Sequence, residues 1–517
     1  MKREGIEGMK PFKSLLFLLA VFAVLAVVML VMPEDGIRIN DDSSIKFTTF
    51  ERLFSKKPEK KNVDKIIESD VDMDKLDEEE RYIVNSDNTI DTVKIIVDEQ
   101  IKVVQKFQYA NDDPSVLYSF FEELLGMKDG GDVRVIHYGD SQIEGDRITD
   151  FLRTKMQGRF GGTGPGMVPA KPANNISASI KQSSSDNWKR YTVFGKADTT
   201  LGHKKYGSLG AFGRFAPVIR KNDTLRIYSD TNAVYEGWLR FDKSSAAYAS
   251  NRIFSKVKMF YGNNTKPVTA GLYNGEELIE EITLLANNTL NLAEWDIPAD
   301  ANPISIKFSG KDSPDIYGIS FEGQNGFAMD NVPMRGSSGL DFTRMDMTFL
   351  ANMYRLLNVK LLILEFGVNI VPNVTDSYGF YEKWFLEQLK ALKRINPGMA
   401  IIVIGVSDMS RKNGEYYESY PNVPLIRDAQ RNAAFKAGCA FWDMYEAMGG
   451  ENSMYSWATA DPPLAGKDFT HFNPRGARII AQMFYNAFLL EYNNYLKGLT
   501  EKSKGKEKEK EKKKNAK

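Results

Sequence analysis

The pattern of hydrophobic residues changes twice along this chain, and no other feature limits its possible folds so strongly. Around residues 133–157, a short apolar strand, a tight Gly-Asp-Ser turn and a helical pattern follow one another. Buried strands alternate with helices again over residues 361–442, and a long helix is predicted at residues 474–495. This alternation predicts an α/β domain with a parallel sheet and helices on both faces.

The segment between these two parts, residues 168–315, follows another pattern. Short runs of alternating polar and apolar residues, such as residues 225–228, 237–241 and 257–261, are separated by turn residues. That pattern predicts an all-β sandwich with a core of its own. We therefore predict an α/β domain in two parts, residues 91–167 and 316–497, interrupted by an inserted sandwich over residues 168–315.

An unbroken run of 18 apolar residues, residues 15–32, lies near the N-terminus. Eighteen residues reach the lower limit for crossing a bilayer, and the lysines and arginine before the run place the N-terminus in the cytoplasm. No small-residue cleavage motif follows the run, so we predict a transmembrane anchor over residues 1–33. The alternative is a cleaved signal peptide. Both interpretations make the remainder extracytoplasmic, either periplasmic or extracellular.

Charged segments with little hydrophobic pattern flank the globular part. Residues 34–90 are predicted to be a stalk or spacer, and the Lys/Glu-rich residues 498–517 a disordered tail. Loose attraction of this tail to an anionic surface is a sharper alternative. The formal net charge is +0, which gives no case for nucleic-acid binding. With one cysteine, no phosphate loop and no metal-ligand cluster, the sequence predicts neither a cofactor nor a metal.

Two short motifs carry the residues that nucleophilic catalysis requires. Ser141 lies at the predicted strand-to-helix turn, where its hydroxyl would be exposed and its N–H would lie at a helix N-terminus. Asp468 precedes His471 by three residues, so its carboxylate can orient the imidazole and leave the other ring nitrogen for the serine. The chain has only 3 histidines. We predict a structural hydrogen bond for His137 and a surface position for His203.

Two turns are candidates for stabilising an oxyanion. A buried strand over residues 361–366 is followed by Gly-Val-Asn, and the side-chain amide of Asn369 is a candidate hydrogen-bond donor. Residues 335–339 read Arg-Gly-Ser-Ser-Gly. The N–H of Gly336 is a second candidate donor, because glycine allows close approach of the backbone to a substrate.

These four pieces, in this order, resemble blocks I, II, III and V of the SGNH (GDSL) hydrolase superfamily. The resemblance implies a flavodoxin-like sheet and no cofactor. It also implies a nucleophile, an acid–base pair and an oxyanion hole, formed respectively by Ser141, by Asp468 with His471, and by Ser141, Gly336 and Asn369. Block III of the family usually ends in Asn-Asp, whereas this chain has Ile370 in the last place. The change removes a local polar anchor and no catalytic group.

A longer string around the nucleophile, residues 137–142, and the glycine-rich residues 161–166 are similar to the peptidoglycan O-acetylesterase branch of this superfamily. In that branch, a β-sandwich resembling a carbohydrate-binding module is inserted after block I. Three aromatic residues of the predicted insert, Trp188, Tyr191 and Trp238, are candidates for stacking on sugar rings, although core packing is the commoner role of such residues.

The resemblance implies a membrane-anchored serine esterase that acts outside the cytoplasm. Its substrate would be an O-acetylated cell-envelope or extracellular polysaccharide, and the reaction would pass through an acetyl-serine intermediate. The first alternative is a polysaccharide O-acetyltransferase that uses the same triad and works with a membrane-bound O-acyltransferase partner. A non-catalytic, glycan-binding envelope protein is the second alternative, and a complete triad argues against it.

Overall fold

The computed structural model describes residues 11–32, 37–40, 43–45, 58–76, 102–127, 130–196, 198, 201–216, 233–414 and 416–515. The chain divides into two compact units: residues 1–59 with 411–418, and residues 60–410 with 419–517. The predicted cytoplasmic end before residue 11 and the predicted strand over residues 225–228 lie outside the described residues.

The first unit contains a long apolar helix, α1 (Pro11–Val31). None of its residues is buried, and by length and composition it is able to cross a membrane. A signal sequence near an N-terminus has the same properties. Two short strands, β1 (Ile37–Asn40) and β2 (Ser43–Ile45), form an antiparallel pair after α1. Another two-stranded pair consists of β18 (Ser410–Asn413) and β19 (Tyr416–Ser419).

A five-stranded parallel sheet forms the centre of the second unit, in the order β15-β3-β16-β17-β20. Its strands are β3 (Val133–Gly139), β15 (Phe327–Pro333), β16 (Val359–Glu365), β17 (Ala400–Ile404) and β20 (Ala440–Trp442). Alternate side chains of β16 enter different hydrophobic clusters, Leu361 and Ile363 on one face and Leu362 and Leu364 on the other. A sheet buried on both faces explains why its strands read as continuous apolar runs.

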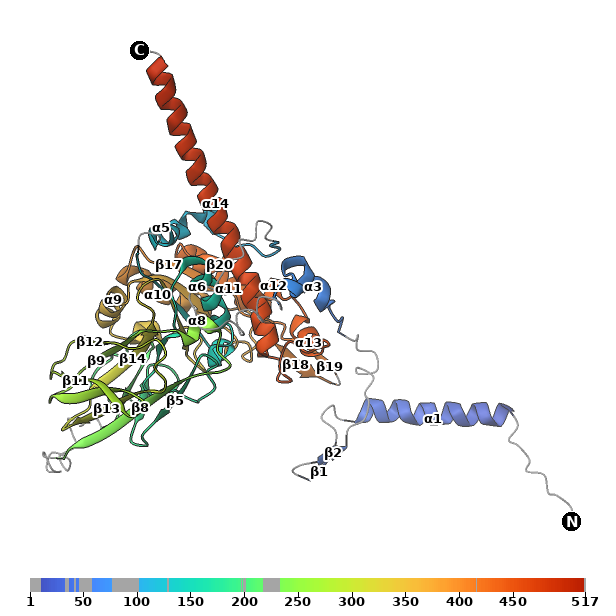
Figure 1. Ribbon diagram of the computed structural model, residues 1–517. Helices are drawn as coiled ribbons and strands as arrows, with labels where there is room; N and C mark the ends of the chain where they lie inside the picture. Colours follow the sequence, from blue (N-terminus) through green and yellow to red (C-terminus); the bar gives the residue numbers. More distant parts are fainter. Residues whose placement is uncertain are drawn as a thin grey trace. The chain divides into compact units, whose positions relative to one another are not determined.

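Helices cover both faces of this sheet, as Figure 1 shows. One face carries α5 (Tyr118–Gly126), α6 (Thr149–Phe160) and α14 (Pro474–Asn515), and the other carries α9 (Met347–Leu356), α10 (Gly379–Ile395) and α11 (Val423–Lys436). The shorter helices are α3 (Val63–Asp70), α8 (Ala249–Arg252), α12 (Met444–Ala447), α13 (Ser453–Ala458), η2 (Ala110–Asp112), η3 (Pro114–Leu117), η5 (Ser141–Asp146) and η6 (Phe342–Arg344). The predicted α/β fold class is confirmed.

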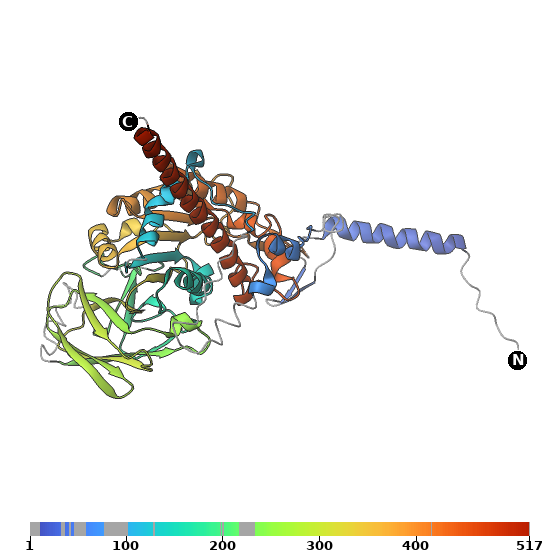
Figure 2. The same ribbon diagram turned by 45° about the horizontal axis from the view of Figure 1, so that its top comes forward.

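The inserted segment forms two antiparallel sheets, ordered β11-β10-β13-β8-β5 and β12-β9-β14-β7-β6, with β4 also paired to β14. The strands are β4 (Gly166–Val168), β5 (Ile180–Ser184), β6 (Lys189–Thr192), β7 (Ala211–Arg214), β8 (Tyr235–Lys243), β9 (Lys256–Gly262), β10 (Val268–Asn274), β11 (Glu277–Leu284), β12 (Asn291–Asp296), β13 (Ile304–Gly310) and β14 (Asp315–Glu322). Because β14 only begins at Asp315, the sandwich extends beyond the predicted segment end at residue 315. Figure 2 shows these strands gathered beside the helices of the α/β part.

The sandwich shares part of its core with the α/β part, which differs from the predicted separate core. One apolar cluster lies between its two sheets. A second cluster joins sandwich side chains such as Tyr317 to Tyr138 of β3 and Phe349 of α9. The rings of Tyr317 and Phe349 are 4.7 Å apart, and the Tyr138 hydroxyl donates to the Ser208 carbonyl at 2.6 Å. The aromatic outer face of the sandwich is therefore buried against the α/β part.

Two segments predicted to lack regular structure are helical. Within the predicted spacer, α3 buries Val63 and Ile67, and the N–H of Lys61 donates to the Ser456 hydroxyl at 2.9 Å. Helix α14 continues through the predicted tail as far as Asn515. Lysine and glutamate are strong helix formers, so a charged run can extend a helix that packing has already nucleated.

We expect the sandwich and the α/β part to unfold in one transition, because they share a core. Leu209 lies in the shared cluster and is 5% exposed. Leu209→Ala should lower the free energy of unfolding of the protein by about 2–5 kcal/mol. The matched control is Leu278→Ala in β11, since Leu278 is 47% exposed. Chemical denaturation, followed by far-ultraviolet circular dichroism and tryptophan fluorescence, measures the unfolding of both variants. Two transitions, with only one shifted by Leu209→Ala, would contradict a shared core.

Candidate active site

The carboxyl ends of β15, β3 and β16 lie side by side. In the register of these parallel strands, Pro333 and Glu365 both pair with Gly139. The N–H of Met334 donates to the Gly139 carbonyl at 2.7 Å, so the loop after β15 leaves the sheet next to the end of β3. The loops that follow the three strands therefore meet at one edge, where open α/β sheets commonly bind ligands.

Asp140 holds two of these loops together. Its Oδ1 accepts the N–H of Gln142 at 2.9 Å, and its Oδ2 accepts the N–H groups of Gly367 at 3.0 Å and Val368 at 3.3 Å. Burial raises the pKa of Asp140 to about 7, although the three N–H donors favour its ionised form. The turn that carries Ser141 is thus fixed to the loop after β16.

Ser141 begins the short 3-10 helix η5 instead of an α-helix. The helix predicted over residues 143–157 starts later, at Thr149, because Glu144 and Gly145 have non-helical dihedral angles. Gly145 has a φ of 76°, and a Cβ there would lie 3.1 Å from the Ile176 carbonyl oxygen. This position therefore favours glycine. The N–H of Ser141 lies at the start of a 3-10 turn, and the N-terminus of α6 is further along the chain.

Ser141, His471 and Asp468 form a continuous chain of hydrogen bonds. The Ser141 hydroxyl lies 2.7 Å from His471 Nε2, and His471 Nδ1 lies 2.8 Å from Asp468 Oδ2. In that arrangement the ring N–H at Nδ1 donates to the carboxylate, and Nε2 is the acceptor for the serine proton. The geometry is that of a nucleophile, a general base and an orienting acid.

Local backbone geometry keeps Asp468 ionised. Partial burial would raise its pKa, but hydrogen bonds from the His471 ring and from the backbone N–H groups of His471 and Thr470 outweigh it and lower the pKa. The two backbone N–H groups lie 3.1 and 3.0 Å from Asp468 Oδ1. Phe469, between Asp468 and Thr470, takes a positive φ of 53°, which turns the backbone so that both N–H groups face the Asp468 carboxylate.

Gln142 is a positioning residue to which sequence reasoning gave no role. It is buried, and its side-chain amide donates to the Thr470 carbonyl at 2.9 Å and to the Ser407 hydroxyl at 3.1 Å. Its Oε1 accepts the N–H of Phe472 at 3.1 Å. The Gln142 side chain thus forms hydrogen bonds with the backbone on both sides of His471. The sequence signals for it are its place beside Ser141 and its membership of the string over residues 137–142.

The two predicted oxyanion donors lie in neighbouring loops. Gly336 has a φ of 82°, and a Cβ built on it would meet open space. The side-chain amide of Asn369 donates to the Ser337 carbonyl at 2.8 Å, which ties the loop after β16 to the loop after β15. That bond uses one of the two amide hydrogens and leaves the other for a second acceptor. Their role as oxyanion donors, with the Ser141 N–H, stays a prediction.

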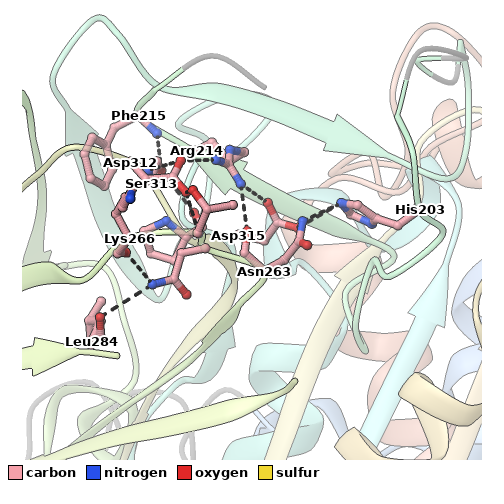
Figure 3. A network of polar contacts seen from close by, with 12 residues as sticks. His203, Arg214, Phe215, Asn263, Lys266, Leu284, Asp312, Ser313 and Asp315 are labelled. Carbon is pink, nitrogen blue, oxygen red and sulfur yellow. Dashed lines mark hydrogen bonds and ion pairs between the residues drawn. The ribbon is translucent and has the colours of Figure 1, made fainter. Parts of the chain in front are cut away.

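The remaining histidines have structural partners. His137 is buried, with Nδ1 2.9 Å from the Thr149 hydroxyl and Nε2 3.1 Å from Glu365, so its predicted structural hydrogen bond is confirmed. His203 is less exposed than predicted, and its Nε2 lies 3.1 Å from Asp315 Oδ2. Figure 3 shows His203 at the edge of a polar network around Arg214. The Arg214 guanidinium donates to Asp315 at 2.7 Å and to Asp312 at 2.9 Å.

Two of the three candidate sugar-stacking residues are packed inside the protein. Trp188 lies in the sandwich core and Tyr191 in the shared cluster, where its ring stacks on Phe212 at 4.9 Å. Trp238 of β8 is 41% exposed and is therefore the one of the three that a glycan could reach. Cys439 is buried, and burial raises the pKa of its thiol to about 12, so it is a structural residue.

The parallel sheet, the nucleophile turn after β3 and the inserted sandwich give this chain the fold of the SGNH (GDSL) hydrolases. Among solved structures, a peptidoglycan O-acetylesterase matches with a TM-score of 0.55 and 20% sequence identity, covering 73% of this chain and 96% of that chain. At this identity the likeness establishes the fold alone. The predicted resemblance to the superfamily is thereby confirmed at the level of fold.

Two other solved structures are similar over parts of the chain. An acetyl xylan esterase has a TM-score of 0.25 and 17% identity, with 32% of this chain and 81% of that chain covered. A family two carbohydrate esterase from Cellvibrio japonicus has a TM-score of 0.21 and 7% identity, with 61% of this chain and 99% of that chain covered. These TM-scores are too low to support an argument. Family models and curated protein sequences give no match.

Removing any member of the hydrogen-bonded chain should abolish most activity. We expect Ser141→Ala and His471→Ala each to lower kcat on an aryl acetate by about 10³-fold or more, because triad members act as a unit. Asp468→Asn should also lower kcat, because an amide does not stabilise the charged imidazole as a carboxylate does. His203→Ala, which alters a histidine of the sandwich, is the matched control. Near-normal turnover by His471→Ala would refute this assignment.

Gln142→Ala should lower kcat by about 10–100-fold, because a small displacement of a catalytic base is costly. KM for a small aryl acetate should stay nearly constant, since Gln142 acts through the backbone around His471. Gln324→Ala, at an exposed glutamine, controls for the loss of an amide side chain. Steady-state kinetics with thermal unfolding of each variant separates positioning from stability. An unchanged kcat in a folded Gln142→Ala variant would exclude the positioning role.

Proposed function

We propose that this protein is a serine esterase that removes O-acetyl groups from a cell-envelope or extracellular polysaccharide. The observation that carries the proposal is the hydrogen-bonded chain from Ser141 through His471 to Asp468. A serine hydroxyl needs a base within hydrogen-bond reach to become a nucleophile, and this site supplies one that is already oriented.

The proposed reaction uses these three residues in two steps. Ser141 Oγ attacks the acetyl carbonyl carbon while His471 Nε2 takes the hydroxyl proton. The tetrahedral oxyanion would be held by the N–H groups of Ser141 and Gly336 and by the Asn369 amide. His471 then protonates the departing sugar oxygen, leaving acetyl-Ser141. Water, deprotonated by His471, attacks the acetyl carbon, and acetate leaves as His471 returns the proton to Ser141 Oγ.

A polysaccharide substrate is supported by likeness to a peptidoglycan O-acetylesterase and by the sandwich next to the site. The apolar helix α1 supports a position outside the cytoplasm, with the protein held at the membrane. A topology reporter fused after residue 90 should therefore be active only outside the cytoplasm, on a chain that stays in the membrane fraction. Release of a shortened soluble chain would favour a cleaved signal sequence.

Hydrolysis and acetyl transfer share the acetyl-Ser141 intermediate, so the acceptor distinguishes them. We expect acetate release to exceed formation of acetylated glycan when the protein is given an aryl acetate and an excess of deacetylated glycan. Free acetate is measured enzymatically and transferred acetyl by mass spectrometry, with Ser141→Ala as the blank. If acetylated glycan is the main product and acetate stays near the level of the blank, the protein is an O-acetyltransferase and not an esterase.

A further inference from the structure

A cavity of about 110 Å³ lies between the nucleophile segment and the sandwich. One wall consists of Glu144 and Gly145, which follow Ser141 in η5, and of Arg335, which precedes Gly336. The opposite wall comes from the sandwich and includes Arg190 of β6. The cavity therefore adjoins both the nucleophile turn and a predicted oxyanion loop.

The sandwich wall is fixed to the nucleophile segment. The N–H of Ala178 donates to the Gly145 carbonyl at 3.2 Å, and the Asn174 amide donates to Glu144 at 2.9 Å. Asp146 accepts two hydrogen bonds from the Arg153 guanidinium, at 2.8 and 2.9 Å, which neutralise its charge. The cavity is thus bounded by backbone that does not need to rearrange before a ligand enters.

Arg190 is a cation in this wall that forms no ion pair in the described part of the chain. No hydrogen bond of its guanidinium is found there either, and its Nε is buried without an acceptor. Its Cζ lies over the Phe194 ring, 5.4 Å from the ring centroid. Burial lowers the pKa of Arg190, and the nearby Glu144 opposes this effect. A buried donor that lacks an acceptor in the free protein is a candidate contact for a ligand.

The other charges of the cavity leave it with one net positive charge. Glu144 is the counter-ion of Arg335, but the two are 3.4 Å apart at the closest, and the Arg335 side chain is 66% exposed. Since Arg153 neutralises Asp146, the charges of Arg190 and Arg335 exceed that of Glu144 by one. A guanidinium presents parallel N–H donors that match the two oxygens of a carboxylate.

We propose that this cavity is a substrate subsite that binds a carboxylate of the acetylated glycan, with Arg190 as its main partner and Arg335 beside it. This inference rests on the proposed esterase function, and it defines the substrate as an acidic polysaccharide. The carboxylate belongs either to a uronic acid ring or to an acidic substituent on an amino sugar. Glu144 would accept a sugar hydroxyl and reject a second anion.

Matched substrates test the subsite. An acetylated polyuronate and an acetylated amino-sugar polymer with acidic substituents are each compared with a counterpart whose carboxylates are converted to amides. For at least one pair, kcat/KM should be at least about tenfold higher on the acidic member, and Arg190→Gln should remove this preference by raising KM. The pair that responds identifies the source of the carboxylate. Arg240→Gln, at an exposed, ion-paired arginine of β8, is the matched control.

Activity of Arg190→Gln on a neutral aryl acetate should stay within about twofold of normal, because that substrate has no carboxylate. Equal kcat/KM on the acidic and amidated members of both pairs would overturn the subsite. Equal loss on all substrates would also overturn it, by showing that Arg190 only supports the structure. Absence of acetate release from every ester would instead contradict the proposed function. Calorimetry would then compare the binding of the acidic and amidated members of each pair to the Ser141→Ala variant. Tighter binding of the acidic member of a pair would support the subsite, and equal binding in both pairs would overturn it, independently of catalysis.

Discussion

The hydrogen bond between Ser141 and His471 joins two residues that are 330 positions apart, and the proposed function depends on it. Neither residue is reactive alone, so the chain must bring distant segments together within a few tenths of an ångström. The parallel sheet fixes Ser141 at the end of a central strand. Gln142 then connects that turn to the backbone on both sides of His471. The geometry of the hydrogen-bonded chain thus depends on a buried amide as much as on Ser141, His471 and Asp468 themselves.

Buried charges hold the sandwich to the sheet. Arg134 of β3 donates to Asp330 of β15 at 2.5 Å and also pairs with Glu322 of β14, which contacts Lys258 at 2.8 Å. Burial opposes ionisation of Glu322, but Arg134 and Lys258 outweigh it and lower its pKa from 4.5 to about 2. The resulting stabilisation is present above pH 4.5 and is lost as the pH falls towards 2. Because a buried ion pair is costly to break, it also favours one arrangement of the two parts.

The sequence predicted the α/β class, the inserted sandwich and the three residues that the structure joins by hydrogen bonds, Ser141, His471 and Asp468, because short motifs and hydrophobic periodicity carry that information. It did not predict β15 or α9, because their residues lie outside the segments whose hydrophobic pattern predicts a strand or a helix. Residues 60–76 were assigned to a spacer because their charge hides the few apolar side chains, such as Val63, that pack against the α/β part. The predicted helix after Ser141 starts too early, because the break lies at Gly145, whose positive φ and hydrogen bond with the distant Ala178 N–H do not appear in the hydrophobic pattern.

The sandwich reaches the candidate site although both of its connections lie at the other end of the sheet. The inserted strands begin just after α6 and end just before β15, and the two connections lie at the amino ends of the parallel strands, where the Phe327 N–H donates to the Gly161 carbonyl at 3.0 Å. A flexibly linked binding module would have few contacts with the catalytic part, whereas here Tyr138 and Tyr317 share one apolar cluster. A sandwich held in this way forms a fixed wall of the proposed subsite. Its side chains, Arg190 among them, would therefore select the substrate directly.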